Sequence, residues 1–97
     1  MAASTEAGDD ISVRLKRARY RAWHRGTREM DLILGPFADV RLPRFTMVEL
    51  DRFEALLDEA DTDLLDWVLG QAAVPARIDP ATIVALKTFR QAQAAQQ

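Results

Sequence analysis

The chain has 97 residues, 48% of them hydrophobic and 29% charged, which suits one folded domain and argues against wholesale disorder. It has no cysteine, which excludes disulfides and thiolate metal sites. No apolar run approaches the ~20 residues that a helix needs to cross a bilayer, so we expect no membrane insertion. The first ten residues contain acids and no Lys or Arg, unlike a secretory or transit peptide, and we expect a cytoplasmic protein.

The net charge of −2 is unevenly distributed along the chain. Residues 1–48 hold nine Lys and Arg against six Asp and Glu, a charge of +3, whereas residues 49–97 hold four against nine, a charge of −5. Residues 14–28 contain seven basic residues and no acid. Such a block is either an interaction surface or the solvated face of a helix.

The first helix is predicted to begin near Ile11, after a small and polar segment, residues 1–10, that we expect to be disordered. Its apolar residues follow a 4-3-4 spacing that is typical of a helix: Ile11, Leu15, Ala18 and Ala22. We place Ser12 at its N-cap. Gly26 is expected to end it in the left-handed conformation that glycine adopts without penalty.

A second helix is predicted from Thr27 or Arg28. Its apolar residues, which we expect to face the core, are Met30, Ile33, Leu34 and Phe37. Gly35 and Pro36 lie inside this pattern. Because proline lacks a backbone donor and collides with the preceding turn, the helix is expected either to kink or to stop there. Residues 40–44 contain Leu42-Pro43 and are expected to form a loop.

The third helix has the clearest local signal. Thr46 and Glu49 form a capping box, and Phe45 before the cap is expected to pack on Leu50 as a hydrophobic staple. The predicted apolar stripe of this helix consists of Leu50, Phe53, Leu56, Leu57 and Ala60.

Two further helices complete the predicted fold. Asp61 to Asp63 is expected to cap the fourth, which Gly70 closes, with Leu64, Leu65, Val68 and Leu69 as its apolar set. Asp79-Pro80 predicts the start of the fifth, with Ile83, Val84, Leu86 and Phe89 buried. Residues 91–97 are expected to fray. The prediction is therefore an all-α protein, with residues 11–90 forming a single compact bundle of about five short helices.

Few side chains are suited to catalysis or metal binding. His24 is the only histidine, and in a run of arginines it is more typical of a surface or packing residue than of a catalytic group. The acidic residues between 58 and 66 lack the ligand spacing and the glycine of an EF-hand loop. We therefore expect no catalytic residue, no metal site and no enzymatic activity.

The basic block offers an alternative function, because arginine-rich helices bind phosphate backbones. The sequence pI near 5.3 and the acids Glu29 and Asp31 beside the block argue against a contiguous basic footprint. A small nucleic-acid-binding module is accordingly the second hypothesis, and we expect no nucleic acid as the partner.

The segment from Arg25 to Asp31 places a glycine among charges of both signs. On its own it is typical of a capped turn with surface salt bridges, Arg25 and Glu29 being four residues apart. However, its RGxxE pattern lies in the run YRAWHRGTREMD, and LILGPF, FEALL and DTDLLDW follow. In order and spacing these residues resemble the SdhE family, the flavinylation and assembly factors of succinate dehydrogenase, with relatives in mitochondria. The resemblance extends from about Arg14 to Phe89.

This resemblance implies a bundle of about five helices that binds the flavoprotein subunit of succinate dehydrogenase, and in some bacteria that of fumarate reductase. It implies that the protein promotes covalent attachment of FAD to a histidine of that subunit. FAD is then the cofactor of the partner, and we expect this chain to bind none stably by itself and to be a monomer when free. Matching the family motif gives the partner-binding residues Arg25, Gly26, Arg28, Glu29 and Asp31.

Overall fold

The computed structural model describes the backbone of residues 2–95 and the side chains of residues 11–95. Five α-helices and one short 3₁₀ helix occur in this range, and no strand: α1 (Ala2–Trp23), α2 (Arg28–Arg41), η1 (Leu42–Arg44), α3 (Met47–Leu57), α4 (Asp61–Val68) and α5 (Pro80–Ala95). The predicted all-α bundle of about five helices is confirmed. None of the helices in the described range is both long enough and apolar enough to span a membrane.

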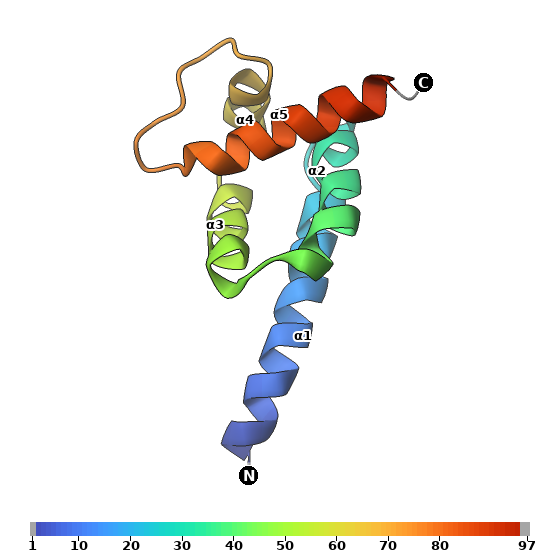
Figure 1. Cartoon of the computed structure of the whole chain (residues 1–97), viewed down its shortest axis with the longest axis vertical. Coiled ribbons are helices and arrows are strands. Elements are labelled where there is room, and N and C mark those ends of the chain that lie inside the picture. The colour runs from blue at the N-terminus through green and yellow to red at the C-terminus, as the bar shows by residue number, and fades with distance from the viewer. Residues whose placement is uncertain (1, 96–97) are drawn as a thin grey trace.

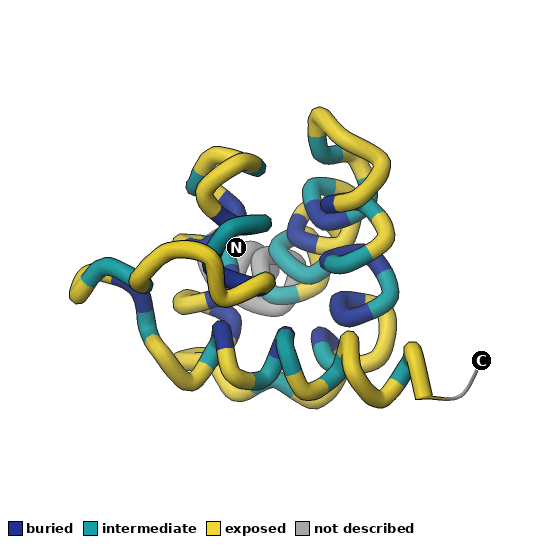
Figure 2. Tube along the Cα trace, turned by 90° about the horizontal axis from the view of Figure 1, so that it is seen from above, coloured by how far each residue is buried: buried dark blue, intermediate teal, exposed yellow. Residues whose placement is uncertain are grey.

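The helices pack around α1 and α2. In Figure 1, α2 returns alongside α1, α3 runs in the same direction as α1, and α5 lies across α2 and α4. The first turns of α1 extend beyond the rest of the bundle. Buried and exposed positions alternate along the helices, as an amphipathic arrangement requires (Figure 2).

Both ends of the helical region differ from the prediction. α1 begins at Ala2, so Ser12 lies inside the helix and does not cap it. Helix extension adds one hydrogen bond for each residue fixed, and the alanines and Glu6 favour it. α5 continues through the alanine-rich segment to Ala95, past the predicted start of fraying at Gln91. Met1, Gln96 and Gln97 lie outside the described residues, as do the side chains of residues 2–10.

α2 continues through Pro36 and ends at Arg41. The predicted loop at residues 40–44 was wrong, because Val40 and Arg41 belong to α2 and Leu42–Arg44 form η1. Proline removes only one backbone donor from a helix, and here it lies at a position that is not fully buried. A single missing bond near the surface can be replaced by water, so the packing of α2 on its neighbours keeps it helical.

The core is organised around the ring of Phe37. The rings of Phe89, Phe53 and Phe45 lie with their centroids at 5.6, 5.8 and 6.2 Å from it, distances typical of favourable aromatic pairs. Phe45 contacts the rings of Phe37 and Phe53, and its packing on Leu50 stays a prediction. The capping box beside it is confirmed, since Thr46 Oγ1 accepts from Glu49 N at 3.2 Å and Thr46 N donates to Glu49 Oε1 at 2.8 Å.

Three residues assigned to the core by periodicity are exposed. Ala60 lies beyond the end of α3 and is the N-cap of α4, and Leu69 is the C-cap of α4. Val84 is 59% exposed on the outer face of α5. Trp67, which we did not place in the core, is buried. These errors fall at helix ends and edges, where the 3.6-residue period no longer fixes which neighbour a side chain meets.

Gly35 allows α1 and α2 to approach closely. A Cβ built on Gly35 would overlap three ring carbons of Trp23. The indole therefore lies directly on the backbone of α2, and its Nε1 donates to Asp39 one turn further on, at 3.2 Å.

We predict that Gly35→Ala destabilises the fold by about 1–3 kcal/mol, the usual cost of overpacking, although alanine favours a helix. The free energy of unfolding, measured by urea titration with circular dichroism, tests this. In a Trp23→Leu background the added methyl group no longer meets the indole. An equal penalty in both backgrounds would contradict the close contact.

Phe53 and Val84 give a second test of the core. Phe53 is fully buried, so Phe53→Ala should cost about 3–5 kcal/mol, whereas Val84→Ala should change the free energy of unfolding by less than about 0.5 kcal/mol. The same urea titration applies. A nearly neutral Phe53→Ala would show that the buried face of α3 has been assigned wrongly.

Candidate functional site

The predicted partner-binding residues lie in the turn between α1 and α2 and in the first turn of α2. α1 ends at Trp23, and Thr27 is the N-cap of α2, with its Oγ1 accepting from Met30 N at 3.3 Å. Arg25 and Gly26 therefore lie in the turn itself. Their geometry depends on contacts with a distant part of the chain, the junction between α3 and α4.

The side chain of Arg25 is directed into the protein. Its Nε donates to Asp61 Oδ1, its Nη1 to the carbonyl of Leu57 and its Nη2 to the carbonyl of Glu59, each at 2.8 Å. The two carbonyls belong to the end of α3 and the link to α4, where helical carbonyls lack partners within the helix. The side chains of Arg25 and Asp61 are only 10% and 16% exposed. A planar guanidinium is suited to such a site because its donors have a fixed fork geometry.

Asp61 also holds the backbone of the turn. Its second oxygen, Oδ2, accepts from Gly26 N at 2.8 Å, while Asp31 Oδ1 accepts from Arg25 N at 2.6 Å. We had expected Asp61 to be part of the N-terminal cap of α4. Instead Ala60 is the N-cap, with no side-chain cap bond. The Asp61 carboxylate accepts hydrogen bonds from Arg25 and Gly26 in the turn. We call Arg25, Asp61 and their hydrogen bonds to Gly26, Leu57 and Glu59 the Arg25 clamp.

The predicted left-handed conformation of Gly26 was wrong. Among the described residues only Gly70 has a positive φ, at 74°, which confirms it as the glycine that closes α4. Space is limited at Gly26 instead, because a Cβ there would lie 3.3 Å from Asp61 Oδ2, a tight contact from which the carboxylate would have to shift slightly. Glycine thus lets the carboxylate reach the Gly26 amide.

The five candidate residues divide into two groups. Arg25 and Asp31 make hydrogen bonds within the chain and support the turn. Gly26, Arg28 and Glu29 are exposed, and the hydrogen bonds of the described residues include no side-chain bond of Arg28 or Glu29. The local pair of Arg25 with Glu29 is not formed, because Arg25 pairs with Asp61. Sequence reasoning missed Asp61, since a carboxylate at a helix start looks like an ordinary cap.

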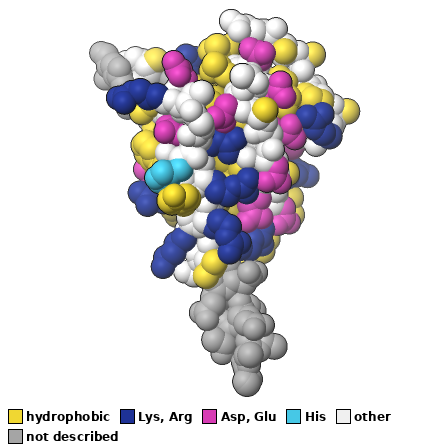
Figure 3. All heavy atoms as spheres, turned by 180° about the vertical axis from the view of Figure 1, so that it is seen from behind, with side chains coloured by type: hydrophobic (Ala, Val, Ile, Leu, Met, Phe, Trp, Pro, Cys, Tyr) yellow, Lys and Arg dark blue, Asp and Glu magenta, His cyan; other side chains and the backbone are white. Residues whose placement is uncertain are grey.

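Most of the basic block is neutralised within the molecule. The pairs are Arg14 with Asp51 and Glu54, Arg19 with Asp39, Arg21 with Asp58, and Arg25 with Asp61, all at 2.6–2.8 Å. Because α1 and α3 run in the same direction, Arg14, Arg21 and Arg25 meet Glu54, Asp58 and Asp61 in the same order along the two segments, whereas Arg19 pairs with Asp39 of α2. Figure 3 shows basic side chains bordered by acidic ones on this side of the molecule. The contiguous basic footprint that nucleic-acid binding needs is therefore interrupted.

These contacts also shift pKa values. Hydrogen bonds to Glu54 and Asp51 raise the pKa of Arg14. Desolvation alone would raise the pKa of Asp39, but hydrogen bonds from Arg19 and Trp23 lower it overall, and the bond from Arg77 lowers the pKa of Glu59. A lowered folded-state pKa contributes stability above the unfolded-state value, which is lost as the pH falls through the folded-state value. Both carboxylates therefore stabilise the fold at neutral pH and cease to do so in acid.

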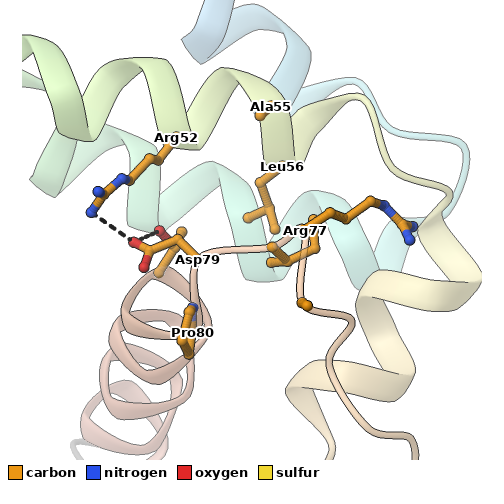
Figure 4. A pocket seen from close by; sticks show the side chains of 9 residues that line it. Arg52, Ala55, Leu56, Arg77, Asp79 and Pro80 are labelled. Carbon is orange, nitrogen blue, oxygen red and sulfur yellow. Dashed lines mark hydrogen bonds and ion pairs between the residues drawn. The ribbon is translucent and has the colours of Figure 1, made fainter.

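A hollow of about 330 Å³ lies between α3 and the start of α5 (Figure 4). The polar side chains that line it make hydrogen bonds and ion pairs within the chain. Arg52 donates to Asp79 Oδ2 at 3.3 Å, and Asp79 accepts from Thr82 Oγ1 at 3.0 Å in the first turn of α5. Arg77 pairs with Glu59 at 2.7 Å. The contacts attach the segment before α5 to α3. Together with the pairs of Asp58 with Arg21 and of Asp61 with Arg25, the pair of Glu59 with Arg77 shows that the acids of this region are directed at arginines.

The model of one protein family, described as the flavinator of succinate dehydrogenase, matches residues 16–90. The FAD assembly factor SdhE of Acetobacter pasteurianus is 37% identical over 73 residues, which are 75% of this chain and 67% of that protein. The mitochondrial succinate dehydrogenase assembly factor 2 of Lodderomyces elongisporus is 45% identical over 60 residues, and that of Cryptococcus neoformans 40% over 70. These alignments cover 62% and 72% of this chain, but only 37% and 40% of the fungal proteins. No solved structure matches the chain.

We predict that breaking the Arg25 clamp lowers the free energy of unfolding. Asp61→Ala leaves the largely buried Arg25 without its counterion and should cost about 3 kcal/mol. Asp58→Ala is the matched control, because it removes a pair with side chains 35% and 72% exposed and should cost less than about 1 kcal/mol. Urea unfolding measures both. Equal effects would show that the clamp contributes no more than a surface ion pair.

Proposed function

This chain belongs to the family of flavinators of succinate dehydrogenase, and we propose that it binds the flavoprotein subunit of that enzyme and promotes covalent attachment of FAD to it. The match to the family model over residues 16–90 supports this proposal, as does the presence of the RGxxE segment within the match. The flavoprotein subunit is the natural target because it is the part of the enzyme that carries the flavin.

One observation carries the proposal furthest: the Arg25 clamp fixes a turn next to two exposed and oppositely charged side chains. Arg28 and Glu29 begin α2 directly after the turn, and the clamp ties that turn to α3 and α4. A surface that is already ordered loses little conformational entropy when it binds. Neighbouring charges of both signs also give a contact directional specificity.

The proposed mechanism needs no catalytic group from this chain. Binding that favours the conformer in which the flavin and the partner's histidine are in reacting geometry accelerates their bond formation. In this proposal FAD belongs to the partner, and this chain holds none stably. Arg28 and Glu29 contact the flavoprotein, Gly26 permits close approach of its backbone, and Arg25 and Asp31 position the turn.

We predict that Glu29→Ala and Arg28→Ala each lower the covalently bound FAD of the flavoprotein subunit at least about tenfold, since each removes a charged contact across the interface. Flavin fluorescence of the denatured subunit in a gel measures this after co-expression in cells without their own factor. Both side chains are exposed, so the melting temperature should hardly change.

Asp63→Ala and Arg90→Ala are the matched controls, because they remove exposed charges of the same sign elsewhere on the molecule. Both should support flavinylation as well as the unchanged protein does. If folded Glu29→Ala and Arg28→Ala both restored flavinylation fully, the exposed charges of the motif would have no role in the reaction.

A further inference from the structure

The outer face of α1 carries a hollow that the RGxxE segment does not include. It has a volume of about 500 Å³ and is lined by Lys16, Arg19, Tyr20, Trp23 and His24. All five residues belong to α1 or directly follow it, and the hollow ends where the turn of the Arg25 clamp begins. Figure 3 shows this side of the molecule, with histidine in cyan.

The aromatic wall of the hollow is ordered although it faces solvent. Tyr20 is 63% exposed, and its ring stacks on that of His24 with centroids 3.9 Å apart and planes 16° apart. His24 Nδ1 lies 2.8 Å from the carbonyl oxygen of Tyr20. Since a carbonyl only accepts hydrogen bonds, Nδ1 carries the proton, and in the neutral ring Nε2 is the available acceptor. The two rings thus pack on each other at the surface of α1.

The third aromatic residue packs against α2. Trp23 lies on the backbone of Gly35 and donates through Nε1 to Asp39 at 3.2 Å. Arg19 donates to the same carboxylate through Nε at 2.6 Å. Tryptophan and tyrosine are enriched among the anchor residues of protein interfaces.

Among the residues that line the hollow, Lys16 has no acidic partner in the described part of the chain, as is also true of Arg17 outside the hollow. Arg14, Arg21 and Arg25 are paired with acids of α3 and α4. Within the described residues, no side-chain hydrogen bond or ion pair involves Lys16. Arg19 is paired with Asp39 through its Nε alone. The side chain of Arg19 is 63% exposed, so its remaining donors are open to an additional carboxylate.

We propose that this hollow binds an acidic segment of the flavoprotein subunit, as a second contact beside Arg28 and Glu29. The inference rests on the proposed function. Lysine and arginine select carboxylates, and the Tyr20–His24 stack accepts the apolar parts of the same segment. Because the hollow is an open depression on one helix, it cannot enclose most of a small molecule as a ligand pocket does, which favours a peptide segment.

Affinity measurements with charge-reversed variants test the proposal. Lys16→Glu and Tyr20→Ala should each weaken the Kd for the purified flavoprotein subunit about tenfold or more, measured by biolayer interferometry. Arg17→Glu is the matched control, because it makes the same charge change on α1 outside the hollow and should change Kd less than about threefold. The affinity of Lys16→Glu should also depend less steeply on salt than that of the unchanged protein.

A photo-crosslinker identifies what occupies the hollow. Benzoylphenylalanine at position 20 should form a crosslink that mass spectrometry maps to a segment rich in Asp and Glu on the flavoprotein, whereas the same group at Val84, which is 59% exposed on α5, should not. A crosslink to a segment without acidic residues overturns the proposal. So does direct binding of free FAD that Tyr20→Ala abolishes, because the hollow is then a flavin site.

The outcomes separate this inference from the proposed function. If Lys16→Glu and Tyr20→Ala bind as tightly as Arg17→Glu while Glu29→Ala does not, the hollow has no role and the proposed function stands. If the unchanged protein itself does not bind the flavoprotein subunit, both proposals are wrong.

Discussion

Arg25 connects the turn after α1 to the end of α3 and the start of α4 through one guanidinium and one carboxylate. A largely buried ion pair adds little net stability compared with apolar packing, because desolvation offsets the attraction between the charges. Its contribution is geometric. The pair satisfies two helix-end carbonyls and the Gly26 amide, so the turn has one arrangement. The orientation of α2 and the position of Arg28 and Glu29 follow from that arrangement.

The helix α1 has two distinct faces. On one face, arginines form ion pairs with acidic side chains of the α3–α4 region. The opposite charges of the two halves of the sequence therefore attract each other within the domain. On the other, Lys16 and the Tyr20–His24 stack face solvent without an acidic counterpart from α3 or α4. One helix therefore holds the bundle together and presents a surface, and a count of arginines alone does not distinguish these uses.

A protein of this size can assist a covalent reaction without supplying a nucleophile, an acid or a metal. What it supplies in our proposal is a rigid surface whose binding energy favours one conformer of a partner. The fold meets this requirement economically, since the phenylalanine cluster around Phe37 fixes the helices and the Arg25 clamp fixes the turn. The residues that position the surface then differ from the residues that form it.

Local sequence determined the features whose causes lie within a few residues of each other. The capping box of Thr46 and Glu49, the start of α5 at Pro80 and the helical periodicities were all predictable, and they suffice for an all-α bundle. The five candidate residues were also found from the sequence, through the family motif. Tertiary structure alone decided their separate roles, because Asp61, Leu57 and Glu59 are 32 to 36 residues from Arg25 and no local pattern links them. It likewise decided that a Cβ at Gly26 would crowd the Asp61 carboxylate and that α2 continues through Pro36, since both depend on what packs against the backbone and not on its own preferences.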